Sequence, residues 1–270
     1  RYADVARVAG LQGSAGSPAA DLLGRAHEVT VPLDRGRWDA ASAAMQTLTK
    51  AAQSSDATLL SRTSTNTMGL LMRAYAPDAS FAGDLRSAAD LLLARHLLFQ
   101  SSAMAWAAAY TGDVALAREL VGLAEGHPLM EAYPANAAMQ QLALAEMDLA
   151  SGNAAAAIDR LAPAVAGNEG LYFTRAVLMR AYGAEGKLKE ARELAQWLAM
   201  NRGRALAEPS SLGVLQPVNL IEANLALRAS GRLADRIGDT AAAKEQAVAF
   251  AEAWPEGDQL LLVTRRAAAF

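Results

Sequence analysis

The chain has 270 residues, no cysteine and a formal net charge of -3. This balance gives no net attraction to nucleic acid or to an anionic membrane, and the lack of cysteine excludes disulfides, thiolate nucleophiles and cysteine-ligated zinc. Hydrophobic residues make up 53% of the chain but aromatic residues only 6%, so alanine and leucine dominate, and both favour helices. We therefore expect an all-α protein. Its apolar runs are far shorter than the roughly 20 residues of a membrane-spanning helix, so we expect no membrane insertion.

The first 20 residues differ in composition from the rest of the chain. A short amphipathic piece, Tyr2 to Leu11, precedes a stretch rich in glycine, serine and proline that is typical of a flexible linker. We therefore expect an N-terminal segment and linker at 1–20 and one helical domain at 21–270. Because the chain begins at Arg1, without a methionine or a leader, we interpret it as a piece of a larger polypeptide or a processed product.

Four helices are expected before residue 99. The first two, at 22–34 and 39–53, are joined around Gly36, and Pro32 should kink or shorten the first of them. The third, at 56–75, is unusually polar between Ser61 and Thr67, and the fourth covers 84–98. Buried hydroxyl groups need hydrogen-bond partners, so this polar stretch either faces solvent or the rim of a groove, which we favour, or lines a polar cavity.

Four glycines mark regular turns in the rest of the chain. Each follows an apolar helical pattern and precedes an alanine by five residues. Glycine ends a helix at low cost in the left-handed conformation, and alanine allows the next helix to pack closely. The glycines are Gly112, Gly152, Gly186 and Gly238, and the alanines are Ala117, Ala157, Ala191 and Ala243. The pattern predicts the helix pairs 99–110 with 114–125, 135–150 with 154–165, 171–184 with 188–200, and 218–237 with 240–254. A loop is expected at 201–217, and a capping helix at 260–270.

The spacing of these glycines resembles the tetratricopeptide repeat family. Gly152 and Gly186 are 34 residues apart, the repeat length of that family, and the spacings of 40 and 52 residues on either side indicate insertions. In the segment 171–200 the family's packing positions are occupied by Leu178, Tyr182, Leu188, Ala191, Ala195 and Leu198. The resemblance covers 99–200 and 218–255, although Arg175 stands at the family's early tryptophan position. It implies a right-handed α-solenoid of helix-turn-helix hairpins, closed by the C-terminal capping helix.

The resemblance also implies a concave groove, lined by the first helix of each hairpin, that holds a peptide or a helix of a partner protein. The candidate binding residues at the groove-facing positions are Phe99, Trp106, Tyr110, Met139, Glu146, Phe173, Arg180, Asn224, Arg228 and Arg232. Aromatic residues at one end and arginines at the other suit an extended peptide with an apolar residue and an acidic group. The alternative, left open at this point, is that Trp106 and Phe99 fill the core between hairpins.

Sequence patterns for catalysis and cofactor binding were sought without success. No glycine-rich loop follows a strand pattern to bind phosphate, and no serine lies in a Gly-x-Ser-x-Gly setting. The histidines His27, His96 and His127 fall in different hairpins, without a second histidine three or four residues away to share a metal. We therefore assign no catalytic, cofactor or metal site and do not expect an enzyme.

The leading functional hypothesis is a protein-interaction or scaffold module that binds a peptide or partner protein. Its alanine-rich turns resemble helical repeat regions attached to bacterial signalling proteins such as nucleotide cyclases, kinases and winged-helix regulators, so a regulatory region in the cytoplasm is expected. One alternative is a small-molecule-sensing effector domain, in which Trp106, Tyr110 and Arg180 enclose a ligand. Another is an α/α-toroid enzyme that uses Glu146 and Asp148, although a helix points these about 200° apart. A homo-oligomer is a further option that the sequence leaves open.

Overall fold

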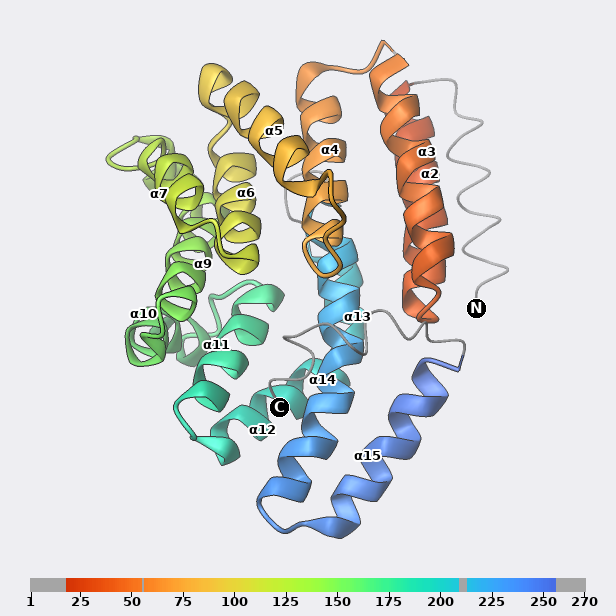
Figure 1. Ribbon diagram of the computed structural model, residues 1–270, viewed down its shortest axis with the longest axis vertical. Helices are drawn as coiled ribbons and strands as arrows, with labels where there is room; N and C mark the ends of the chain where they lie inside the picture. The colour runs from red at the N-terminus through yellow and green to blue at the C-terminus, as the bar shows by residue number, and fades with distance from the viewer. Residues whose placement is uncertain (1–17, 55, 209–212, 256–270) are drawn as a thin grey trace.

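The computed structural model describes residues 18–54, 56–208 and 213–255 (Figure 1). Within these ranges the chain forms fourteen helices and no strand. The expectation of an all-α protein is therefore confirmed for the described part of the chain. The capping helix expected at 260–270 lies outside the described residues, as does nearly all of the N-terminal segment expected at 1–20.

The first four described helices lie close to the predicted positions. Pro32 lies in the last turn of its helix, which ends two residues later at Asp34. The fourth helix begins and ends three residues earlier than predicted, because His96 adopts a left-handed conformation with a φ of 52° and stops it. The four helices are α2 (Pro18–Asp34), α3 (Trp38–Ser54), α4 (Leu59–Arg73) and α5 (Phe81–Arg95).

Four helix pairs follow, each near its predicted boundaries. They are α6 (Leu98–Thr111) with α7 (Val114–Gly122), α9 (Pro134–Ala150) with α10 (Ala154–Ala166), α11 (Tyr172–Ala184) with α12 (Leu188–Met200), and α14 (Gln216–Arg236) with α15 (Thr240–Ala253). Two short helices, α8 (Leu129–Ala132) and α13 (Arg202–Ala207), were missed by the sequence analysis. Helix α13 lies within the segment that was expected to be a loop.

The glycine turns are confirmed in detail. Gly112, Gly152, Gly186 and Gly238 all have positive φ angles, between 73° and 101°. In all four pairs the second helix begins two residues after the glycine. In three of them the residue between, Asp113, Asn153 or Asp239, accepts a hydrogen bond from a backbone N–H of the first turn. Glycine and an N-terminal cap therefore cooperate to reverse the chain in few residues.

The small residues at the contacts between helices are buried in three pairs but not in the last. Ala157, Ala191 and Ala195 are fully buried. In α15 no residue is buried, and Ala247, which holds the same repeat position as Ala195, is exposed. The last helix therefore buries less of its surface than its counterparts do.

The first and last described parts of the chain lie side by side. Helix α14 contacts α2 and α4 as well as α11, α12 and α15, and Figure 1 shows it continuing below α4 with α15 beside it. Arg202 of α13 also forms an ion pair with Asp34 at the end of α2. One hydrophobic core, from Leu22 to Trp254, extends through the helices. The helix pairs are thus held together by long-range contacts as well as by contacts between sequence neighbours.

Alanine at the contact between α11 and α12 is expected to be essential for close packing. We expect Ala195→Leu to lower the free energy of unfolding by about 1–3 kcal/mol, because the added methylene groups overfill a packed contact. The same change at the exposed equivalent position, Ala247→Leu, should alter it by less than about 0.5 kcal/mol. Urea unfolding followed by circular dichroism measures both, and equal effects would contradict the assignment of the buried contact.

Candidate functional site

Two almost fully buried glutamates meet one arginine in the interior. Arg180 of α11 places its Nη2 atom 2.5 Å from Oε2 of Glu146 in α9, and its Nη1 atom 2.7 Å from Oε1 of Glu222 in α14. The side chains of Glu146 and Glu222 are 1% and 3% exposed, and that of Arg180 is 11% exposed. One guanidinium group therefore joins three helices through charge-assisted hydrogen bonds.

Aromatic side chains surround these charges. The ring of Trp106 stacks on that of Tyr110 at a centroid distance of 4.8 Å, and Phe173 meets Trp106 edge-on at 4.7 Å. The guanidinium of Arg180 lies 5.2 Å from the centroid of the Tyr110 ring, which provides a cation–π contact. Trp106 also donates a hydrogen bond from Nε1 to Glu146. These residues, with Tyr75 and Glu222, are called the Arg180 cluster below.

Tyr75, which follows α4, completes the cluster. Its hydroxyl donates a hydrogen bond of 2.6 Å to Oε1 of Glu222, a residue 147 positions away. Burial raises the pKa of Glu222, although Arg180 and Tyr75 oppose the rise. Burial opposes the charge of Arg180, yet Glu146 and Glu222 hold its pKa far above the ordinary value. Arg180 therefore stays charged and binds the two carboxyl groups together.

The structure brings half of the predicted binding residues together in this cluster. They are Trp106, Tyr110, Glu146, Phe173 and Arg180. These side chains pack against one another in the interior. The sequence analysis missed Tyr75 and Glu222. In the sequence, Glu222 stands out as the one glutamate of the mostly apolar stretch 218–237, which could have indicated a buried charge. No feature of the sequence marks Tyr75.

The other predicted residues lie elsewhere. Phe99, Met139 and Asn224 are buried in the core, where Asn224 donates to the backbone carbonyl of Leu220. Arg228 and Arg232 line a separate hollow of about 510 Å³ between α14 and α15. Burial and the charge of Arg232 lower the pKa of Arg228.

An open groove lies on another side of α4. One hollow of about 430 Å³ is formed by α3, α4 and the start of the segment that leads to α5, and a second of about 270 Å³ is formed mainly by α4, α5 and α6. Gln53 and Asn66 line both hollows, so the two adjoin at these side chains. We call them together the α4 groove. Apolar lining residues are Trp38, Met45, Leu70 and Met72 in the first hollow, and Leu59, Leu91, Leu92 and Met104 in the second.

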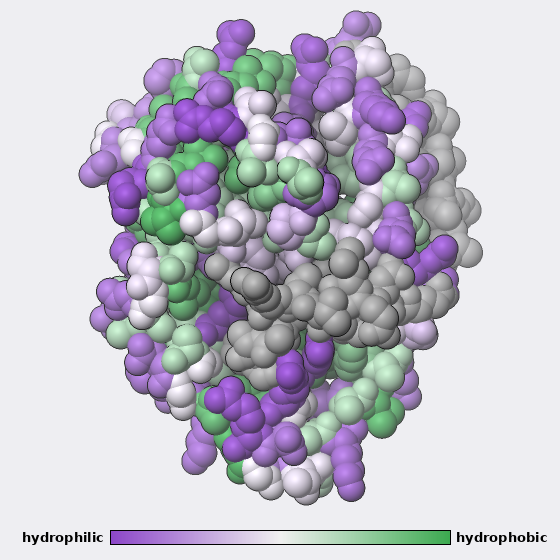
Figure 2. Space-filling model, in the orientation of Figure 1, coloured by the Kyte–Doolittle hydropathy of each residue, from purple (hydrophilic) through white to green (hydrophobic). Residues whose placement is uncertain are grey.

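The groove follows one face of α4. The lining residues of α4 recur every three or four positions from Leu59 to Arg73, as expected for one face of a helix. At a rise of 1.5 Å per residue, these 14 steps correspond to roughly 21 Å. The exposed rim is partly apolar, since Leu59 and Leu91 are 38% and 39% exposed. Figure 2 shows hydrophobic surface over α5, among hydrophilic residues, on the face seen there.

Most of the polar stretch at 61–67 is buried. Ser64 and Thr65 are buried, and Ser64 accepts a hydrogen bond from Gln100, so the solvent-facing prediction is wrong for these residues. Thr63 and Thr67 are buried as well, and with Asn66 they line the second hollow, so the prediction of a solvent-facing or rim position is wrong for these two threonines too. Thr67 satisfies its hydroxyl group by donating to the carbonyl of Thr63, one turn earlier.

Several polar side chains that line the groove make no hydrogen bond or ion pair within the described residues. They are those of Gln46, Lys50, Gln53, Arg62 and Asn66. Three of these are amides, each with donors and an acceptor, and two are cations. The groove therefore offers both hydrogen-bonding groups and positive charge beside its apolar hollows.

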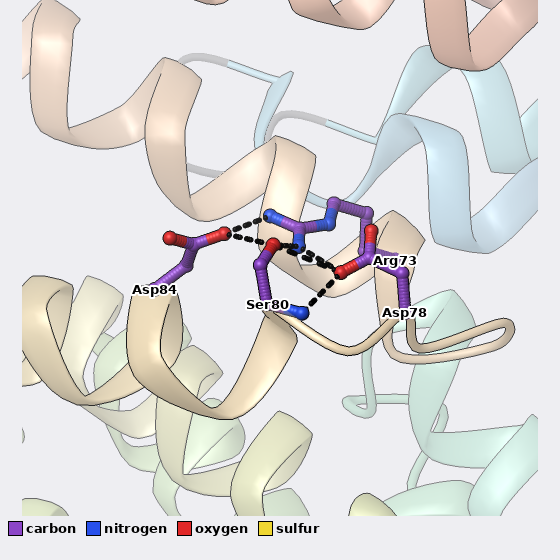
Figure 3. A network of polar contacts seen from close by, with 4 residues as sticks. All are labelled: Arg73, Asp78, Ser80 and Asp84. Atoms are coloured by element: carbon purple, nitrogen blue, oxygen red, sulfur yellow. Dashed lines mark hydrogen bonds and ion pairs between the residues drawn. The ribbon is translucent and has the colours of Figure 1, made fainter.

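One end of the groove is held by a polar network around Arg73 (Figure 3). Arg73 donates to Asp84 and Asp78 at 2.8 Å each, and to the hydroxyl of Ser80 at 2.9 Å. The backbone N–H of Ser80 donates to Asp78. The hydrogen bonds from Arg73 lower the pKa of both aspartates. Two carboxylates thus neutralise Arg73, in contrast to Lys50 and Arg62.

The fold and these two sites define, in the described residues, an all-helical protein of helices packed against their neighbours, with a packed polar interior and a lateral groove. In comparisons with known proteins, no family model, no curated protein and no solved structure matches the chain. None of the helices in the described ranges combines the length and the apolar character that a bilayer crossing requires. Among the same residues, no group of three histidine or acidic side chains gathers to hold a metal ion.

Arg180 is expected to matter most for stability at neutral and higher pH. We expect Arg180→Met to lower the free energy of unfolding at pH 7 by about 3–5 kcal/mol, because it leaves two buried carboxylates without their counter-charge. Without Arg180, the pKa of Glu222 in the folded protein rises further. The loss should therefore shrink as the pH falls from 8 toward the unfolded-state glutamate pKa of about 4.3, since the protonated group needs no counter-charge.

Urea unfolding at pH 8, 6.5 and 5 measures this dependence. As the control, Arg180→Met combined with Glu222→Gln removes one of the two carboxylates, and it should recover part of the stability and flatten the pH dependence. A loss for Arg180→Met that is the same at all three pH values would contradict the electrostatic role.

Proposed function

We propose that this chain is a protein-interaction module that binds a segment of a partner protein in the α4 groove. In this proposal the helix pairs form a right-handed solenoid of the tetratricopeptide type, and the module is the scaffold or regulatory part of a bacterial signalling protein. The glycine turns, the buried alanines and the 34-residue spacing of Gly152 and Gly186 support the repeat assignment. The observation that carries the binding proposal is the row of unpaired amide side chains in an open, partly apolar groove.

The dimensions of the groove suit an extended segment. Roughly 21 Å along α4 corresponds to about six residues of extended chain at 3.3–3.6 Å each. The amides of Gln46, Gln53 and Asn66 can donate to and accept from the backbone of such a segment. The two hollows can take side chains from it, which is how peptide-binding grooves combine affinity with specificity.

The interior is less suited to binding. The rings of Trp106 and Tyr110 are stacked, and Arg180 is bound to Glu146 and Glu222. A small-molecule effector site between Trp106, Tyr110 and Arg180 would have to separate these groups. Neither hollow of the α4 groove is lined by them.

The toroid-enzyme alternative has less support. Glu146 is bound to Arg180 and Trp106, while Asp148 pairs with Arg160 at 3.1 Å. The two carboxylates thus face different partners and do not converge on one space. A pair of carboxylates that acts on a sugar must flank the same bond.

A blocking substitution tests the proposed groove. We expect Gln53→Trp to reduce peptide binding at least tenfold, because position 53 is exposed and lies where the two hollows meet. The probe is a displayed library of random eight-residue peptides selected on the wild-type chain, with dissociation constants of the enriched peptides measured by fluorescence anisotropy.

The matched control is Thr47→Trp, at an exposed position of the same helix that does not line the groove. It should leave binding within twofold of wild type. Light scattering at the same concentrations shows whether a second copy of the chain competes for the groove. If no peptide is enriched, or if both variants bind the enriched peptides as wild type does, the proposed function is wrong.

A further inference from the structure

We propose that the segment bound in the α4 groove is acidic at its centre and carries a large apolar residue on each side. This inference rests on the proposed function and specifies the chemistry of the partner. It is carried by the arrangement of charge and apolar surface along the groove.

The charge of the groove is positive. Lys50 on α3 and Arg62 on α4 are both exposed, and in the described residues neither has a carboxylate partner. Asp78 is the one acidic residue among the side chains that line the two hollows, and Arg73 already binds it. The whole chain has a net charge of -3, so this positive surface is a local feature. A segment with a carboxylate at this place would gain two cationic partners and meet no unpaired anion of the groove.

The cations lie beside the junction of the hollows. Gln53 and Asn66 line both hollows and mark the junction. Lys50 precedes Gln53 by three residues on α3, and Arg62 precedes Asn66 by four residues on α4, so each cation is a same-face neighbour of a junction amide. A carboxylate of the bound segment is therefore best placed at the junction, between the two hollows.

The hollows on either side are apolar at their walls. Trp38, Met45 and Met72 line the first, and Met72 is almost fully buried behind it. Met104, which is fully buried, lines the second together with Leu91. Apolar side chains of the segment that enter these hollows would be removed from water, which favours binding.

The bound segment therefore carries an apolar, an acidic and a second apolar residue, in this order, within about six residues. A basic segment would meet Lys50 and Arg62 with like charge. A wholly polar segment would leave both hollows unfilled. The carboxylate thus provides selectivity, while the apolar residues provide most of the contact area.

Charge reversal tests this inference. The double variant Lys50→Glu with Arg62→Glu is compared with the control Arg118→Glu with Lys189→Glu, which changes the net charge equally at exposed positions away from the groove. Random eight-residue peptides are selected by display on the wild type and on each variant. We expect the wild type and the control to enrich peptides with aspartate or glutamate between two large apolar residues, and the groove variant to lose this preference.

Defined peptides make the result quantitative. The most enriched wild-type peptide should bind the groove variant at least tenfold more weakly and the control within twofold. Its version with asparagine or glutamine in place of the acid should bind the wild type about threefold more weakly or worse, since one exposed ion pair contributes modestly. Circular dichroism of both variants establishes that they are folded.

The possible failures are distinguishable. If the enriched peptides are blocked by Gln53→Trp but show no acidic preference, or bind the groove variant and the control equally, this inference is wrong while the proposed function stands. If no peptide is enriched, or if Gln53→Trp leaves binding unchanged, the proposed function fails and this inference fails with it.

Discussion

The paired hydrogen bonds of Arg180 with Glu146 and Glu222 are the interaction on which the arrangement of the helices depends. Burying three charged groups is costly, and the cost is offset only when the geometry of the pairs is maintained. Tyr75 and Trp106 add donors to the same two carboxylates, so the cluster ties the end of α4 to α6, α9, α11 and α14. Alanine contacts are non-directional and tolerate sliding. The charged cluster, by contrast, selects one relative placement of helices that are far apart in the sequence.

This interior network fills the space where the sequence predicted a binding groove. A groove along the first helices of the hairpins would need open space at Trp106 and Arg180, yet these residues complete each other's contacts. Polar groups without partners are found instead beside α4, where α3 and α5 leave two hollows. The polar network of Arg73 secures the far end of the groove, and its charges are used within the protein. The remaining cations, Lys50 and Arg62, are therefore the ones that a partner would meet.

The two regions illustrate different uses of polar residues. In the Arg180 cluster, donors and acceptors satisfy one another and contribute to a unique structure. In the α4 groove, the amides and the cations Lys50 and Arg62 make no hydrogen bond or ion pair within the described residues. The stability of the first region and the proposed recognition role of the second are separable, since Arg180 and Gln53 belong to different sets of contacts.

The sequence by itself determined the local features of this protein. The left-handed turns at Gly112, Gly152, Gly186 and Gly238, the helix pairs around them and the buried alanines of three pairs all follow from backbone preference and helical periodicity, which act within a few residues. Five residues that meet in the Arg180 cluster were also named from their repeat positions, as candidates for an open groove with a core position left open for Trp106, but without Tyr75 or Glu222. Their burial was decided by tertiary structure, because it depends on α14 reaching α4 across 147 residues of sequence. The α4 groove has the same origin: its walls come from α3, α4, α5 and α6, and periodicity within one helix carries no information about the gap that its neighbours leave.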